Sequence, residues 1–178
     1  SDQAHSSIEK SVMAAGLGRN GVRRIPSDTA FRMDVDALEA AIERDLAAGH
    51  RPMLIGATLG TTSTASVDPI ARIADVARKS GVWLHVAAAY AGSAALLPEG
   101  RHAVDGWEHA DSIVINPHKW LGTALDCSVL LFRDSAPFRE ALSLTPAYLS
   151  SEHDGVTNLM EMGLPLGRRF RALKLWLL

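Results

Sequence analysis

Apolar residues follow two different periods along the chain, one typical of buried strands and one typical of helices. Runs that are apolar at nearly every position predict strands buried on both faces, and they occupy residues 52–60, 82–89, 112–116 and 127–134. Segments with apolar residues at every third or fourth position predict amphipathic helices, at residues 6–17, 34–48 and 68–81. A short strand at residues 22–27 and two further helices, one beginning near Ala136 and one after Pro165, complete the prediction.

Acidic residues mark the starts of two of these helices. Asp34 or Asp36 can cap the helix of residues 34–48 by accepting hydrogen bonds from its free amides. Asp68 precedes Pro69, which needs no amide partner, so we expect Asp68 to cap the next helix. A second role for Asp68, as the charge partner of a lysine, is compatible with capping. The buried face of the first of these helices is predicted to carry Leu38, Ala41, Ile42 and Leu46.

The order of these elements predicts an α/β fold. Strands separated by helices of 10–15 residues form right-handed crossovers, which build a mostly parallel sheet covered by helices on both faces. Ligands of such sheets bind beyond the carboxyl ends of the strands. The polar or small-residue sequences TTSTAS, AAAYAGS and NPHKW all follow predicted strands, so we expect them to meet at that edge and to form a site.

Composition narrows the classes of function. The chain has 178 residues, of which 47% are apolar and 21% charged, and its net charge of −2 does not favour binding to nucleic acid or to an anionic membrane. No apolar run is long enough to cross a bilayer. The histidines are scattered, which argues against a metal site, and Arg168, Arg169 and Arg171 form only a small basic cluster. The single cysteine, Cys127, excludes an internal disulfide and favours a reducing, cytoplasmic location.

Several familiar sequence motifs are missing, and both ends of the chain look incomplete. The sequence has no GxGxxG turn of a dinucleotide fold, no HExxH metal motif and no GxSxG nucleophile elbow. It begins without methionine, and it ends on LKLWLL inside an apolar helical run without a capping residue. We therefore expect residues 1–178 to be the middle part of a longer protein.

Lys119 is the strongest candidate for chemistry. It follows the predicted strand of residues 112–116, where partial burial would lower its pKa and free the amine to form a Schiff base with a carbonyl cofactor or substrate. The alternative is a lysine whose stem packs over Trp120. The neighbouring His118 could donate to a phosphate or serve as a structural histidine, and Asn116 could contact an anion or only hold the loop.

Four other positions could contribute to a site. His5 could stack on a flat ring, or it could be a polar residue near a helix start. Thr62, in a loop between a strand and a helix, could hold an anion or a phenolic oxygen. The small residues 87–93 could let a ring lie against the backbone or could serve helix packing. Tyr148 could lie on a mobile loop over the site or be an ordinary surface tyrosine.

Six motifs together resemble one known family. SDQAHSS, ATLGTTSTASVDP, WLHVAAAYAGSA, ADSIVINPHKWL, DCSVL and PLGRRFRALK occur in this order over essentially all 178 residues. They resemble the pyridoxal-phosphate-dependent group II amino-acid decarboxylases, in particular the aromatic-L-amino-acid decarboxylase type. The resemblance implies the aminotransferase-like fold (fold type I) and a homodimer with its site near the subunit interface. Residues 1–178 would be the central part of the cofactor-binding large domain, without its N-terminal part and without the small C-terminal domain.

The resemblance also implies an activity and roles for individual residues. The expected reaction converts an L-amino acid, with an aromatic one favoured, to the amine and CO2 with pyridoxal 5'-phosphate as cofactor. Lys119 would hold the cofactor covalently, and Tyr148 would help to protonate the product. The remaining implied cofactor contacts are His5 stacked on one face of the ring, Ala89 on the other, Thr62 at the phenolic oxygen, His118 at the phosphate, and Asn116 and Ala87 nearby.

One position departs from the family pattern. This chain reads HVAAAYAG where the family reads HVDAAYAG, so Ala87 replaces an aspartate whose carboxylate pairs with the pyridine nitrogen. Without that charge the nitrogen is less readily protonated, and we expect weaker cofactor binding and impaired decarboxylation. Two alternatives remain open: a catalytically inactive homologue that acts as a binding or dimerising partner, and a lyase or transaminase using the same lysine. The sequence leaves open which amino acid is the substrate.

Overall fold

The structure, a computed structural model, describes residues 1–144 and 158–178. Its strands are β1 (Leu54–Thr58), β2 (Trp83–Ala87), β3 (Ser112–Ile115) and β4 (Val129–Phe132). Its α-helices are α1 (Ser7–Ala14), α2 (Val35–Ala47), α3 (Ile70–Ser80), α4 (Ala136–Leu142) and α5 (Ala172–Trp176). Short 3-10 helices are η1 (Arg19–Gly21), η2 (Ala91–Leu96), η3 (Pro98–Val104), η4 (Trp107–His109) and η6 (Leu159–Met162).

The four strands form one sheet in the order β1-β2-β3-β4. β1, β2 and β3 run parallel, and β4 pairs antiparallel with β3. The predicted α/β class and mostly parallel sheet are therefore confirmed. The connection from β1 to β2 contains α3, as the alternation of strand and helix patterns predicted.

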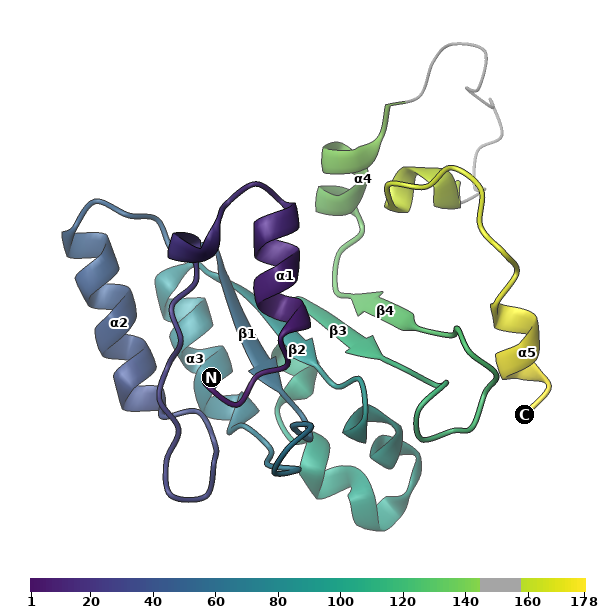
Figure 1. Ribbon diagram of the computed structural model, residues 1–178, viewed down its shortest axis with the longest axis horizontal. Helices are drawn as coiled ribbons and strands as arrows, with labels where there is room; N and C mark the ends of the chain where they lie inside the picture. The colour runs from purple at the N-terminus through teal and green to yellow at the C-terminus, as the bar shows by residue number, and fades with distance from the viewer. Residues whose placement is uncertain (145–157) are drawn as a thin grey trace.

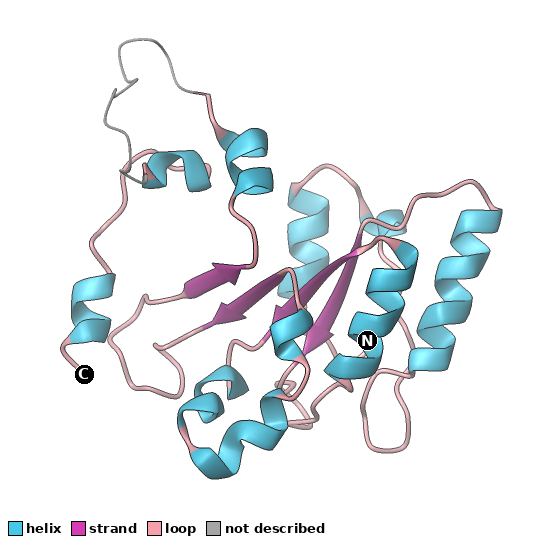
Figure 2. Ribbon diagram, turned by 180° about the vertical axis from the view of Figure 1, so that it is seen from behind, coloured by secondary structure: helices cyan, strands magenta, loops and turns pink. Residues whose placement is uncertain are grey.

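Helices cover the two faces of the parallel strands (Figures 1 and 2). On one face lies α1, and Ile8 packs so closely on β1 that a Cβ at Gly56 would lie 3.4 Å from its Cδ1 atom. The other face is the main core, where α3 places Ile70 and Ile73 against fully buried residues of β1 and β2. This burial removes the apolar face of α3 from water and contributes most of its stability.

Three sequence predictions about the elements are wrong. Residues 22–27 are not a strand, because they have no neighbouring strand to pair with beyond a single bridge between Ser27 and Met33. Leu46 is 52% exposed, because the last turn of α2 extends past the core that buries Leu38, Ala41 and Ile42. In β4, Leu130 and Leu131 are almost half exposed, so among the described residues the fourth strand is not covered on both faces.

Candidate functional site

The site is built where two chain turns follow the carboxyl ends of β2 and β3. The backbone N–H of Asn116 donates to the carbonyl of Ala89 at 3.1 Å, and the N–H of Lys119 donates to the carbonyl of Asn116 at 2.9 Å. Beside them the rings of Tyr90 and Trp120 stack, with centroids 5.5 Å apart and an interplanar angle of 5°. The structure therefore brings Lys119, Asn116 and Ala89 together, as the strand pattern predicted.

Two glycines allow the turns that follow β1, β2 and β3 to approach one another closely. A Cβ at Gly92 would lie 2.9 Å from a side-chain carbon of Ile115 at the end of β3. Gly60, after β1, has a φ of +76°, and a Cβ there would lie 2.8 Å from that of Ala91. Larger residues at either position would push the turns apart.

Lys119 is exposed among the described residues. The prediction that the Lys119 side chain is partly buried is therefore wrong. Residues 117–121 form a turn beyond the edge of the sheet instead of continuing β3. The position still suits a nucleophile, because the amine is accessible and its backbone is held by the bond to Asn116.

His118 is held in one tautomer by the backbone of Cys127. The N–H of Cys127 donates to Nδ1 of His118 at 3.0 Å, and the N–H of His118 donates back to the carbonyl of Cys127 at 3.4 Å. A backbone N–H can only donate, so Nδ1 carries no proton and the neutral ring carries its proton on Nε2. His118 can therefore donate a hydrogen bond from Nε2, which is the chemistry needed at a phosphate.

Ala87 shares one face of the sheet with a short polar relay. The register pairs Ala87 with Thr58 and with Val114, and residues alternate faces along a strand, so His85 lies on the same face as Ala87. Trp83 Nε1 donates to Ser112 Oγ at 2.9 Å, and that hydroxyl lies 2.8 Å from Nδ1 of His85. Burial lowers the pKa of His85, which favours the neutral ring.

His85 was missed by sequence reasoning. The available signal was a single polar residue inside the otherwise apolar run VWLHVAAA. Its partner Ser112 lies 27 positions away and joins it only when β2 and β3 pair. A local sequence pattern cannot predict a contact between residues that are this far apart in the chain.

The same region holds polar atoms without partners among the described residues. The Thr58 hydroxyl and the side-chain carbonyl oxygen of Asn116 are buried and make no hydrogen bond there. A polar ligand at this edge would satisfy them, since buried polar groups in proteins are nearly always paired. The exposed lysine and the Nε2 donor of His118 thus fit an aldehyde that carries a phosphate, and the Asn116 oxygen could accept only from a donor group of such a ligand.

The face around Ala87 does not supply an acidic partner for such a ligand. On this face the described strands β1, β2 and β3 present Leu54, Gly56, Thr58, Trp83, His85, Ala87, Ser112 and Val114, none of which is acidic. A cationic ring nitrogen placed here would therefore gain no ion pair from the strands.

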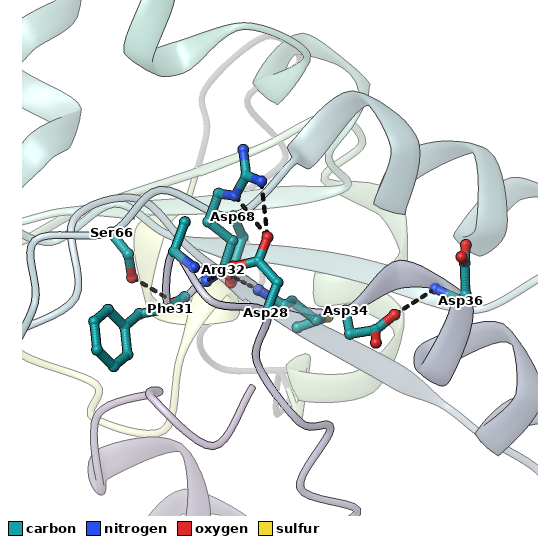
Figure 3. Close-up of polar contacts among 9 residues, drawn as sticks. Asp28, Phe31, Arg32, Asp34, Asp36, Ser66 and Asp68 are labelled. Carbon is teal, nitrogen blue, oxygen red and sulfur yellow. Dashed lines mark hydrogen bonds and ion pairs between the residues drawn. The ribbon is translucent and has the colours of Figure 1, made fainter.

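Hydrogen bonds from two loops hold the end of β1 and the loop that follows it, and Figure 3 shows Asp68, Ser66 and Phe31 among the residues involved. The carboxylate of Asp68 accepts from the N–H of Met33 at 2.7 Å and from the N–H of Thr58 at 2.8 Å. Nearby, Ser66 Oγ donates to the carbonyl of Phe31 at 2.7 Å. Thr62 is exposed in the loop that these bonds hold.

Asp68 is therefore not a helix cap, and that prediction is wrong. Pro69 occupies the cap position of α3, and no side chain caps this helix. The Asp68 side chain is almost completely buried, and burial raises its pKa although two backbone donors oppose the shift. By contrast, Asp34 caps α2 as predicted, accepting from the N–H groups of Asp36 and Ala37.

The Asp68→Asn variant is expected to be less stable by about 1–3 kcal/mol, because the amide NH2 cannot accept the second backbone N–H and leaves it buried without an acceptor. The matched control is Asp36→Asn, which removes an exposed ion pair with Arg72 and should change stability little. Denaturant unfolding of the intact protein measures both. Equal effects of the two substitutions would contradict this role of Asp68.

The remaining predicted site residues have different outcomes. His5 precedes α1 and is exposed, with Nδ1 2.8 Å from Ser7 Oγ. The start of α1 lies toward the edge to which β1 points (Figure 1). Tyr148 lies outside the described residues. Within residues 1–144 and 158–178 no cluster of three or more acidic, histidine or cysteine side chains could hold a metal ion. No described helix is long and apolar enough to cross a membrane.

Comparison with known proteins shows the family to which this chain belongs. Residues 1–178 match the family model described as the pyridoxal-dependent decarboxylase conserved domain. The aromatic-L-amino-acid decarboxylase of Sus scrofa is 46% identical over 99% of this chain, which covers 36% of that protein. The chain thus spans about a third of the length of the curated relatives it matches.

Two solved structures resemble this one closely. Oryza sativa TDC, crystallised with PLP and tryptamine, superposes with a TM-score of 0.94 and 45% identity, over 98% of this chain and 37% of the other. Catharanthus roseus tryptophan decarboxylase in complex with L-tryptophan gives a TM-score of 0.91 and 42% identity, over 99% and 38%. These likenesses confirm the predicted aminotransferase-like fold.

Proposed function

The chain belongs to the pyridoxal-dependent decarboxylase family, and on that premise we propose that the intact protein decarboxylates an L-amino acid with pyridoxal phosphate. In the overall reaction the carboxylate leaves as CO2, and a proton takes its place on Cα to give the amine. The observation that carries the proposal is the pairing of the Lys119 turn with the Ala89 turn at the carboxyl edge of the sheet.

The residues of this chain have distinct tasks in the proposal. When bound, the cofactor acts as an electron sink for the pair released from the breaking carbon–carboxylate bond. Lys119 would hold its aldehyde carbon through Nζ, and His118 would donate from Nε2 to the phosphate. His5 and Ala89 would enclose the ring, Thr62 would contact its phenolic oxygen, and Asn116 would supply a further polar contact. Tyr148 would deliver the proton to Cα.

Ala87 limits the rate in this proposal. Among the described strands, the face around it carries no carboxylate to keep the ring nitrogen protonated, so the natural protein is expected to be a slow decarboxylase. A catalytically inactive binding or dimerising partner is the second candidate, and the same absence of charge favours it.

An aromatic substrate is part of the proposal, because the similar proteins include an aromatic-L-amino-acid decarboxylase and a tryptophan decarboxylase. The test is a screen of L-amino acids against the intact protein with pyridoxal phosphate, measuring CO2 and amine together. Amine formed from tryptophan, tyrosine or dihydroxyphenylalanine in equal amount to CO2 would support it. Binding of the cofactor without either product would favour the inactive homologue.

A homodimer and a cytoplasmic location complete the proposal. The location is supported by the single cysteine, which is free and buried and therefore needs no oxidising compartment. The dimer is supported by membership of the family alone, and light scattering of the intact protein tests it. A monomer at the concentration used for the activity screen would remove this part of the proposal.

A further inference from the structure

The C-terminal segment of the chain holds the loop that follows the Lys119 turn. In Figure 1 this segment runs to α5 beside the loop that connects β3 to β4. Arg169 Nη2 donates to Asp126 Oδ1 at 2.6 Å, and Arg171 donates to Asp126 Oδ2 from Nε at 3.0 Å and from Nη2 at 2.8 Å. Lys174 Nζ donates to the carbonyl of Ala124 at 2.6 Å. Three cations thus fix residues 124–126.

Asp126 directly precedes the residue that orients His118. Cys127 is buried and makes both backbone hydrogen bonds to His118, one of them to the ring nitrogen Nδ1. Movement of the Asp126 backbone therefore moves the N–H that fixes the tautomer of the ring. The hydrogen bonds from Arg171, with a smaller contribution from Arg169, lower the pKa of Asp126 to about 2, in keeping with a carboxylate held by cations.

We propose that Asp126, held by Arg169 and Arg171, is a positioning residue that keeps His118 in the tautomer with its proton on Nε2. The proposal rests on the proposed function for the role of His118 at a phosphate, but the state of the ring itself is independent of any cofactor. From the sequence alone, the arginine cluster was only a small basic patch. The proposal gives it a role at the site, through an aspartate more than 40 residues away in sequence.

The first test measures the ring without cofactor. In the intact protein labelled with 15N-histidine, with the His118 signal assigned from His118→Gln, the wild type is expected to show a protonated Nε2 and an unprotonated Nδ1. Asp126→Ala is expected to mix the two tautomers. The matched control, Asp36→Ala, removes another exposed aspartate–arginine pair and should leave the signal unchanged. An unchanged His118 signal in Asp126→Ala would overturn the proposal.

The second test uses two ligands that differ only in the phosphate. Asp126→Ala is expected to weaken binding of pyridoxal phosphate by roughly 2- to 150-fold, the range for groups coupled through one hydrogen-bond network. Binding of pyridoxal should change by less than about twofold, because His118 serves the phosphate. In a His118→Ala background the same substitution should have no further effect. The proposal would be overturned if Asp126→Ala weakened the binding of both ligands equally, or if its effect added to that of His118→Ala. Either result would mean that Asp126 only stabilises the loop.

Asp126→Asn provides a second test in case Asp126→Ala does not fold. It keeps the shape and one acceptor oxygen, so its effects should lie between those of the wild type and of Asp126→Ala, with thermal unfolding as the check. Failure of the wild type to bind pyridoxal phosphate through Lys119 would refute the proposed function, while the 15N measurement would still decide the state of His118.

Discussion

The Ala87→Asp variant of the intact protein is expected to decarboxylate its amino-acid substrate about 30-fold to several thousand-fold faster than the natural chain. The range follows from roughly 2–5 kcal/mol for a buried charge pair, with each 1.36 kcal/mol worth a factor of ten in rate.

The physical reason lies in the face of the sheet that Ala87 shares with Thr58 and His85. A carboxylate added there would face a ring nitrogen with no competing acidic group on the described strands, and it would stabilise the protonated form. Burial favours the neutral form of His85, and the neutral ring does not supply or repel charge at that position. The protonated ring accepts electrons more readily, and the barrier to CO2 loss falls.

The measurement compares kcat/KM and the dissociation constant of pyridoxal phosphate for wild type and Ala87→Asp. Both should improve. Ala71→Asp is the matched control, because it adds the same charge to the exposed first turn of α3, on the opposite face of the sheet. If Ala87→Asp and the natural protein turned over at the same rate, the assignment of position 87 to the ring nitrogen would be wrong.

Replacing Lys119 with alanine is expected to abolish covalent attachment of pyridoxal phosphate and to reduce decarboxylation by at least roughly 10²–10⁴-fold, the range for loss of a positioned catalytic group. The turn that carries Lys119 is fixed by the Asn116 hydrogen bond and the Tyr90–Trp120 stack, so the variant should keep its fold. Its effect can therefore be ascribed to the missing amine.

Borohydride reduction followed by peptide mass spectrometry measures this directly. The wild type should carry the reduced cofactor on the peptide containing Lys119, and Lys119→Ala should carry none. Lys79→Ala is the control, because Lys79 is an exposed lysine of α3 that lies 3.8 Å from Glu39 and far from the proposed chemistry. Labelling of a different lysine in the folded wild type would refute the central assignment.

The sequence could predict most of the sheet and half of the site because these features have local causes. Runs such as 82–89 are apolar at nearly every position, which is typical of strands covered on both faces. The parallel order of the strands places their carboxyl ends at one edge of the sheet. Lys119, Asn116 and Ala89 were expected there and are joined there. Residues 22–27 have a strand-like pattern too, but a strand also requires a partner, which the local sequence does not specify.

The charged and polar contacts of the site were less accessible to prediction. Asp68 stands directly before Pro69, as a helix-capping residue would. In the structure its carboxylate instead accepts hydrogen bonds from the N–H groups of Met33 and Thr58, which come close to it only when the loops pack. The burial of Lys119 was overestimated because the sequence shows that a strand ends, but not how far the next turn extends beyond the sheet.

The sequence by itself determined the α/β class and predicted the edge at which the site forms, while its resemblance to a family implied the roles of Lys119 and of position 87. Only the tertiary structure decided the tautomer of His118, the relay from Trp83 through Ser112 to His85, and the hold of Arg169 and Arg171 on Asp126. The reason is that hydrophobic periodicity is repeated over many residues and tolerates exceptions. A hydrogen bond joins two particular atoms, which become neighbours only after the strands and loops have packed.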